Sequence, residues 1–579
     1  MMLFPPANLL VTILVFLLCI QSSSSQHLPY SGNSTPTWEN CIHVYDSLDQ
    51  SSDIARMISI GTTDVGKPLH LFIINQDMVF YPELFDRKKN ILLINNSIHP
   101  GEPDGVNACM QLCAEILAGQ NNLNELLDST ILCIIPMYNV DGALNRSAMS
   151  RANQNGPIEY GFRGNARNLD LNRDFIKCDS RNAQSFNRIF TRINPHVFVD
   201  THVSNGADYV YTMTLISTQY DKLGGVLGGY LRKQMEPALF SSMKSKGHEM
   251  SPYVNTMGAT PESGLVSFLE SPRFATGYSA LFNAIGFTTE THMLKPFADR
   301  VESTYQFIVS LLEYMDTHAL EIQLIRKNAD DEWSKKKSMF LEFEVDTTKR
   351  DLFRFKGYEA VEKPSAVGSG NRLFYNRSNT WEQDVAWYKT FAGKNEIRIP
   401  DYYILPQAWS EVAERLKWNG IEMTALERDT VIEVEVSFID DHKTSTSVYE
   451  GHYHHYDVKL RKEKQRIRFF KGDFMISTNQ SGKRYLVTVL EPTGGDSFFA
   501  WNFFDSVLQQ KEWFSDYVFE EKAEEILKNN PEIKKEFDAK LASDTDFKAS
   551  HWNQLYWIYK RSDYYEQSAY RYPVYQLNR

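Results

Sequence analysis

The side chains best suited to chemistry in this sequence are two histidines and an acid that follow apolar stretches. His99 and Glu102 stand three positions apart in His-Pro-Gly-Glu-Pro-Asp-Gly, just after the apolar run Ile91–Ile94, and His202 comes just after the apolar run 197–199. Imidazole nitrogen and carboxylate oxygen suit Zn²⁺, which in catalytic sites takes three protein ligands and leaves a fourth position open. The pattern therefore predicts a zinc site formed by His99, Glu102 and His202.

Further polar motifs follow in a fixed order along the chain. They are Asn139-Val-Asp-Gly142, Arg163-Gly-Asn-Ala-Arg-Asn-Leu-Asp-Leu-Asn-Arg173 and Glu290-Thr-His292. Each motif is weak alone, because short patterns such as His-x-x-Glu are common by chance. Their combined order and spacing, from about residue 60 to 320, resemble the zinc metallocarboxypeptidases of the carboxypeptidase A type. The resemblance covers about half of the chain.

The resemblance implies that the three predicted ligands bind one Zn²⁺ and that Glu290 is the general base and acid. The chemistry fits, since zinc lowers the pKa of a water molecule and a nearby carboxylate can pass its proton to the leaving amine. Arg163 is our choice for the arginine that polarises the scissile carbonyl. Arg167 and Arg151 remain alternatives, because this loop does not align unambiguously.

The resemblance also implies how the end of a substrate is recognised. Asn172 and Arg173 match the pair that holds the terminal carboxylate, and Asp170 matches the acid that orients the first zinc histidine. The alternative for this segment is an internal turn with a buried ion pair. A tyrosine from a mobile loop should also be present, with Tyr253 and Tyr278 as candidates.

Three functions are compatible with these motifs. The first is a metallocarboxypeptidase that releases C-terminal residues from peptides. The second is an amidase or deacylase acting on N-acyl amino acids or cell-wall peptides, because the loop after His99 differs from that of the digestive members and resembles bacterial members with such activities. The third is a peptide- or glycan-binding protein without catalysis, which the intact set of ligands and Glu290 argues against. For both enzymes the partner is a peptide or acyl-amino-acid substrate with a free carboxylate.

The order of predicted elements indicates how these residues are positioned. Strands and helices alternate from about 60 to 320, which predicts an α/β three-layer sandwich around a mixed, mostly parallel sheet, with ligands at the carboxyl ends of its strands. Short strands of period two follow, and then a helical stretch. The predicted organisation is a signal peptide at 1–25, an N-terminal lead-in at 26–60, a zinc carboxypeptidase-like catalytic domain at 61–325, a β-rich domain at 326–495 and a helical aromatic-rich region at 496–579.

Several local expectations concern the C-terminal half. Tyr453–Leu460, Arg466–Phe470 and Tyr485–Leu490 are predicted to be separate strands. The histidine cluster at 452–455 is interpreted as part of an ordinary exposed strand and not as a second metal site. The aromatic-rich tail is expected to pack against the rest of the chain, because exposing so much aromatic surface is costly.

Composition and the N-terminal sequence bound the remaining possibilities. The chain has 579 residues, 42% of them apolar, and a net charge of −12, which excludes a disordered protein and argues against nucleic acid or an anionic membrane as partner. The apolar run Leu9–Ile20 is too short to span a bilayer and predicts a cleaved signal peptide, so we expect a secreted or periplasmic protein with no membrane span in its mature form. Among the cysteines outside this run, only Cys41 and Cys178 look free to pair.

Overall fold

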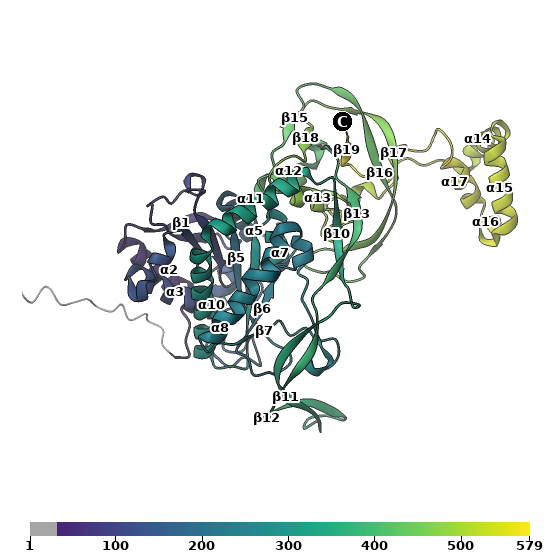
Figure 1. Ribbon diagram of the computed structural model, residues 1–579. Helices are drawn as coiled ribbons and strands as arrows, with labels where there is room; N and C mark the ends of the chain where they lie inside the picture. Colours follow the sequence, from purple (N-terminus) through teal and green to yellow (C-terminus); the bar gives the residue numbers. More distant parts are fainter. Residues whose placement is uncertain (1–31, 579) are drawn as a thin grey trace, which may run out of the picture.

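The computed structural model describes residues 32–578, so the predicted signal peptide at 1–25 lies outside the described residues. Its centre is an eight-stranded sheet in the order β1-β2-β4-β3-β5-β9-β6-β7 (Figure 1). The strands are β1 Ala55–Thr62, β2 Pro68–Ile74, β3 Asn90–Asn95, β4 Thr130–Ile135, β5 Val197–Ser204, β6 Met213–Ser217, β7 Met250–Pro252 and β9 Ile285–His292. The four central strands β4, β3, β5 and β9 are parallel, whereas β1 pairs antiparallel with β2, β2 with β4, and β6 with β9. The edge strand β7 is parallel to β6. The predicted mixed α/β sheet is confirmed.

Helices cover both faces of this sheet, because alternate residues of its buried strands point to opposite sides. In β3, Leu92 and Ile94 belong to the apolar core on one face, and Ile91 and Leu93 belong to the core on the other. The first core is covered by α2 Trp38–Gln50, α3 Asp104–Leu117, α8 Glu236–Ser245, α10 Phe297–Thr317 and α11 Ala319–Lys335. The second is covered by α5 Arg181–Ile193 and α9 Ala275–Ser279. Helix α2 and strand β1 therefore share the core of the catalytic region, although most of both precedes residue 61.

A β-rich region follows, as predicted. Strands β10 Ser338–Val345 and β13 Phe391–Arg398 form one pair, and the long hairpin of β11 Asp351–Pro364 and β12 Asn371–Tyr388 pairs with β8 Leu265–Val266. A six-stranded sheet contains β14 Tyr402–Leu405, β15 Thr424–Ala425, β16 Thr430–Thr444, β17 His455–Phe469, β18 Phe474–Ser477 and β19 Tyr575–Leu577. Its buried residues Tyr403 and Leu405 join the same apolar core as Phe186 and Tyr278, so the two regions are fused by one core.

Two local predictions in this region are wrong. Tyr485–Leu490 belongs to helix α13, Lys483–Leu490, whose residues are all buried. A short apolar run with β-branched residues does not distinguish a strand from a buried helix, and here the surrounding core decides. Tyr453–Leu460 and Arg466–Phe470 are not separate strands, because β17 runs from His455 to Phe469 without a break. The charged residues between them are tolerated because β17 is the edge strand of its sheet.

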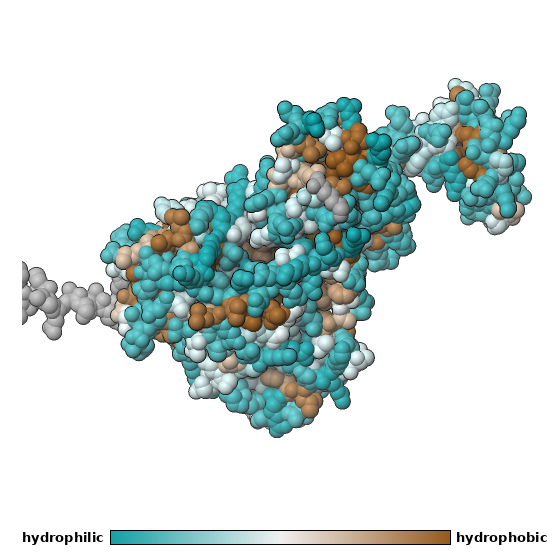
Figure 2. Space-filling view, turned by 45° about the horizontal axis from the view of Figure 1, so that its top comes forward, coloured by the Kyte–Doolittle hydropathy of each residue, from teal (hydrophilic) through white to brown (hydrophobic). Residues whose placement is uncertain are grey.

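The C-terminal aromatic residues pack in two different ways. Phe498, Phe499, Trp501, Phe503 and Phe504 are buried in the core that joins the two regions, as expected. Helices α14 Asp516–Asn529, α15 Pro531–Ser543, α16 Thr545–Ala549 and α17 His551–Tyr559 instead form a bundle that stands apart from the rest of the molecule (Figure 1). This bundle has an apolar core of its own beneath a largely hydrophilic surface (Figure 2). The expectation that the whole tail packs on the rest of the chain is therefore wrong for this bundle.

The structure also bears on disulfide formation and on membrane crossing. Within residues 32–578 all five cysteines are buried free thiols, so Cys41 and Cys178 do not form a disulfide. Over the same residues, no helix combines the length and the apolarity that a membrane crossing requires.

Candidate active site

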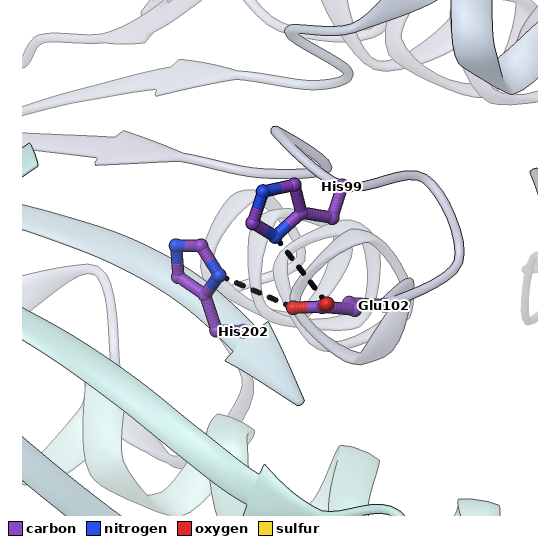
Figure 3. A group of neighbouring side chains, drawn as sticks. All are labelled: His99, Glu102 and His202. Carbon is purple, nitrogen blue, oxygen red and sulfur yellow. Dashed lines mark hydrogen bonds and ion pairs between the residues drawn. The ribbon is translucent and has the colours of Figure 1, made fainter. Parts of the chain in front are cut away.

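The structure brings His99, Glu102 and His202 together at the carboxyl ends of neighbouring parallel strands. His99 and Glu102 lie in the loop between β3 and α3, and His202 lies on β5 (Figure 3). One ligand atom from each of the three residues lies within 4.8 Å of the other two, and all three side chains are buried. Gly105 permits this approach, because a Cβ atom there would meet the Thr201 hydroxyl at 2.1 Å.

Both histidines turn the same ring nitrogen toward the Glu102 carboxylate. His99 Nδ1 lies 3.3 Å from Oε1 and His202 Nδ1 lies 3.1 Å from Oε2. The other ring nitrogen of each histidine contacts a carboxylate: His99 Nε2 lies 2.9 Å from Asp170, and His202 Nε2 lies 2.8 Å from Asp200. A proton held on Nε2 by these acids leaves Nδ1 as the electron-pair donor, which is the arrangement that orients metal-binding imidazoles.

The charges of the cluster suit a cation. His99 Nδ1 is buried and, although it lies 3.3 Å from Glu102 Oε1, it makes no hydrogen bond, so its electron pair is available to a cation. Burial by itself would raise the pKa of Glu102, but Arg151 and His99 hold it well below its usual range. Two imidazoles and an ionised carboxylate form a donor set that fits Zn²⁺.

Glu290 reaches the same cavity from the adjacent strand. The parallel pairing of β5 and β9 places Glu290 directly beside His202. The cavity has a volume of about 490 Å³, and His99, Glu102, His202 and Glu290 all line it. Burial raises the pKa of Glu290 to about 8, against the attraction of His202. A half-buried carboxyl group whose pKa lies near neutrality is suited to taking up and returning a proton.

The turn at Leu171–Arg173 supplies another part of the cavity wall. Asp170 caps it by accepting a hydrogen bond of 2.9 Å from the Asn172 backbone N–H. Asn172 and Arg173 both line the cavity, and the Arg173 guanidinium lies 4.2 Å from the centre of the Phe274 ring. Arg173 Nη1 also lies 3.8 Å from an Asp170 oxygen, so the segment contains an ion pair as well as a cavity wall.

Two of the three candidate arginines line the cavity. Arg163 is held by Asp170 at 2.9 Å and approaches Glu102 at 3.4 Å, whereas Arg151 binds Glu102 at 2.6 Å. Arg167 turns away and donates to the Asp179 backbone carbonyl at 2.5 Å. The geometry therefore leaves both Arg163 and Arg151 within reach of a substrate.

The two candidate tyrosines lie in different surroundings. Tyr253 lines the cavity. Tyr278 is fully buried among aromatic rings, and its hydroxyl donates to Asn419 at 2.7 Å. Only Tyr253 is placed to meet a substrate.

Two acids at the site were not assigned a role from the sequence. Asp200 binds His202 from two positions earlier on the same strand, a spacing that puts both side chains on one face and could have indicated the contact. Glu270 is buried at the cavity wall and accepts two hydrogen bonds from Thr276, through the backbone N–H at 2.7 Å and the hydroxyl at 2.5 Å. No motif in the sequence marks Glu270, because it lies in an irregular loop.

Comparison with known proteins gives several relatives of low overall similarity. "Carboxypeptidase 2" of Trichophyton equinum is 22% identical over 434 residues, which cover 70% of this chain and 72% of that protein. "Carboxypeptidase Z" of Rattus norvegicus is 33% identical over 132 residues, or 21% of this chain and 19% of that protein. Among solved structures, a metallo-carboxypeptidase from Burkholderia cenocepacia aligns with a TM-score of 0.38 at 16% identity, covering 50% of this chain and 70% of that one.

A family model matches a defined stretch of the chain. The model described as zinc carboxypeptidase matches residues 42–205. The matched stretch runs from within α2 to just past the end of β5 and includes His99, Glu102 and His202. It also includes the turn with Asn172 and Arg173. Residues 42–205 of the chain are therefore similar to the zinc carboxypeptidase family.

Proposed function

We propose that this protein is a zinc-dependent carboxypeptidase that removes residues from the C-terminal end of peptides. One observation carries the proposal: a three-residue donor cluster, the carboxyl group of Glu290 and the guanidinium of Arg173 all line a single cavity. The family match and the names of the relatives support the same activity. His99 Nδ1, His202 Nδ1 and the Glu102 carboxylate would hold one zinc ion.

The chain's own residues account for the proton transfers and charge stabilisation. Bound zinc supplies a water nucleophile at neutral pH and a Lewis acid for the scissile carbonyl. Glu290 would accept the proton of the attacking water and return it to the leaving amine. Arg163, with Arg151 as the alternative, would stabilise the negative charge that develops on the carbonyl oxygen.

The cavity wall formed by Asn172 and Arg173 would restrict hydrolysis to the end of a chain. The Arg173 guanidinium can bind a terminal carboxylate through a charge-assisted hydrogen bond, and Asn172 adds a neutral polar group beside it. A residue anchored there leaves only its own peptide bond within reach of the donor cluster and Glu290. Such a site would release one residue at a time.

We also infer that the protein acts outside the cytoplasm, in a secreted or periplasmic location. The apolar run Leu9–Ile20 supports export, and the helices of the described residues supply no membrane span. N-terminal sequencing of exported protein tests this inference, and recovery of an intact N-terminus would contradict cleavage.

The decisive test is a digest of matched peptides that carry free or amidated C-terminal ends, read by mass spectrometry. We expect stepwise shortening of the free peptides only, loss of activity with a zinc chelator and recovery on adding Zn²⁺. Arg173→Ala should lower kcat/KM for the free peptides by about 10- to 100-fold, the value of a charge-assisted hydrogen bond. Equal cleavage of amidated peptides would refute the carboxypeptidase proposal. Turnover of N-acyl amino acids without peptide cleavage would favour an amidase instead.

A further inference from the structure

A turn from the β-rich region lies against the carboxylate-binding wall of the cavity. The tip of the β16–β17 hairpin, residues 449–452, makes three side-chain hydrogen bonds to the segment 170–179. The Tyr449 hydroxyl accepts from Arg173 Nε at 3.1 Å, Glu450 Oε2 accepts from the Asp170 backbone N–H at 2.8 Å, and His452 Nε2 lies 2.7 Å from Asp179 Oδ2. The turn thus holds this segment at both ends and at the proposed anchor of the substrate.

These contacts correct the interpretation of the histidine cluster as an ordinary exposed strand. His452 is half-buried against Asp179. His454 donates toward the Gly495 carbonyl at 2.8 Å, and His455 is buried with one ring nitrogen 3.0 Å from Asp505. The cluster joins the β-rich region to its surroundings, and its rings do not gather around a common point.

The backbone of the turn has a conformation that does not favour its sequence. Tyr449 and His452 exchange both backbone hydrogen bonds, at 2.8 and 3.0 Å, and the two residues between them have positive φ angles of 50° at Glu450 and 84° at Gly451. Such a two-residue turn with left-handed backbone normally favours Asn or Gly at its first central position, so glutamate is an unfavourable choice there. Its bond to the Asp170 backbone is a contact that neither Gly nor Asn is long enough to replace.

The core beneath the turn fixes its position. The Tyr449 ring stacks on Trp501 with centroids 6.1 Å apart and an angle of 18° between the rings, and His452 meets the edge of the same indole. Trp501 itself is fully buried in the core that joins the two regions. The hydroxyl of Tyr449 is therefore presented to Arg173 from a rigid base.

Arg173 is consequently held on three sides. Its Nε donates a hydrogen bond to the Tyr449 hydroxyl, its Nη1 donates to the Asn172 carbonyl at 2.8 Å, and the Phe274 ring lies against the guanidinium. These contacts leave Nη2 as a donor for a ligand. A guanidinium that is already oriented loses less conformational entropy when a carboxylate binds, so orientation improves affinity without adding a contact to the substrate.

We propose that the β16–β17 turn is a structural part of the substrate-binding site, in which Tyr449 orients Arg173 for the terminal carboxylate and Glu450 fixes the backbone that carries it. Both are positioning residues, since they act through Arg173 and Asp170. The inference rests on the proposed function, because it assigns the orienting role at the same site. It also gives the β-rich region a function in substrate recognition.

Tyr449→Phe tests the orienting role, since it removes one hydroxyl and keeps the ring on Trp501. We expect KM for peptides with a free C-terminal end to rise about 3- to 10-fold, while kcat stays within about twofold and zinc content is unchanged. Tyr453→Phe, on the same hairpin with a ring 54% exposed, is the matched control and should behave as the unmodified protein. In an Arg173→Ala background, Tyr449→Phe should have no further effect. An unchanged KM in Tyr449→Phe, or an equal loss in both backgrounds, would overturn the role.

A second measurement does not depend on activity. Hydrogen exchange of the amides at 170–179 should accelerate in Glu450→Ala and stay near the original rate in Glu450→Gln, which keeps an acceptor for the Asp170 N–H. Unchanged exchange in Glu450→Ala would refute the role of the turn even in an active enzyme. Absence of peptide cleavage by the unmodified protein would instead refute the proposed function, so the two failures are distinguishable.

Discussion

Glu290→Gln separates proton transfer from metal binding at the site. Within the described residues the Glu290 side chain makes no hydrogen bond, so the neutral amide, of nearly the same size, removes no protein contact. The donors His99, Glu102 and His202 keep their own partners in the variant. We therefore expect a full complement of zinc and an unchanged fold. Loss of a positioned general base and acid should lower kcat by about 10²- to 10⁴-fold, or about 3–5 kcal/mol of transition-state stabilisation.

The assay is steady-state hydrolysis of a peptide with a free C-terminal end, with zinc measured by atomic emission on the same preparation. Glu290→Asp is the matched control, because it keeps the carboxylate but withdraws it by one methylene group. Its kcat should fall between those of the unmodified protein and Glu290→Gln. A Glu290→Gln protein with full zinc content and nearly normal kcat would remove Glu290 from the mechanism. A variant that fails to bind zinc would show that Glu290 belongs to the donor set.

Two further predictions concern acids at the two ends of the segment 170–179. Asp170→Asn should lower the affinity for zinc by about 10- to 100-fold, because an amide raises the basicity of His99 less than a carboxylate does. Competition with a metal-binding dye measures this affinity, and an unchanged value would contradict the orienting role of Asp170. Although burial raises the pKa of Asp179, its bond to His452 and the charge of Lys177 hold that pKa well below its ordinary value. Its ionised form therefore stabilises the fold fully above about pH 4 and progressively less as pH falls toward the folded-state pKa. Asp179→Asn should lower the free energy of unfolding by about 1–3 kcal/mol at pH 7 and by less at pH 3, measured by urea denaturation; a pH-independent difference would show that charge is not the cause.

The sequence predicted the catalytic sheet well because its signals are local. Apolar runs such as Ile91–Ile94 are buried on both sides in any α/β sandwich, so a short apolar run and its flanking residues were sufficient to identify each strand. Tyr485–Leu490 shows where this fails. A helix buried on all sides has no polar face, and its apolar run then looks like that of a strand.

In the candidate site, too, some contacts could be predicted from the sequence and others could not. His99 and Glu102 follow β3, and His202 lies near the end of the neighbouring strand β5, so their approach could be expected from the order of elements and the resemblance together. The contacts of Tyr449 and Glu450 could not be predicted, because they join residues more than 270 positions apart. Such pairings depend on how one region docks on another, and hydrophobic periodicity carries no information about docking.

Two parts of the cavity wall depend on residues beyond 330. The turn at 449–452 holds the segment with Arg173. In addition, β12 pairs with β8 and the Trp387 indole donates to the Ser267 hydroxyl at 2.9 Å, next to Phe268 in the cavity wall. The donor cluster and Glu290, in contrast, lie on β5, on β9 and in the loop that follows β3. Under the proposed function, the central sheet would position the groups for bond cleavage, and the β-rich region would position the part of the cavity wall that meets the end of the substrate.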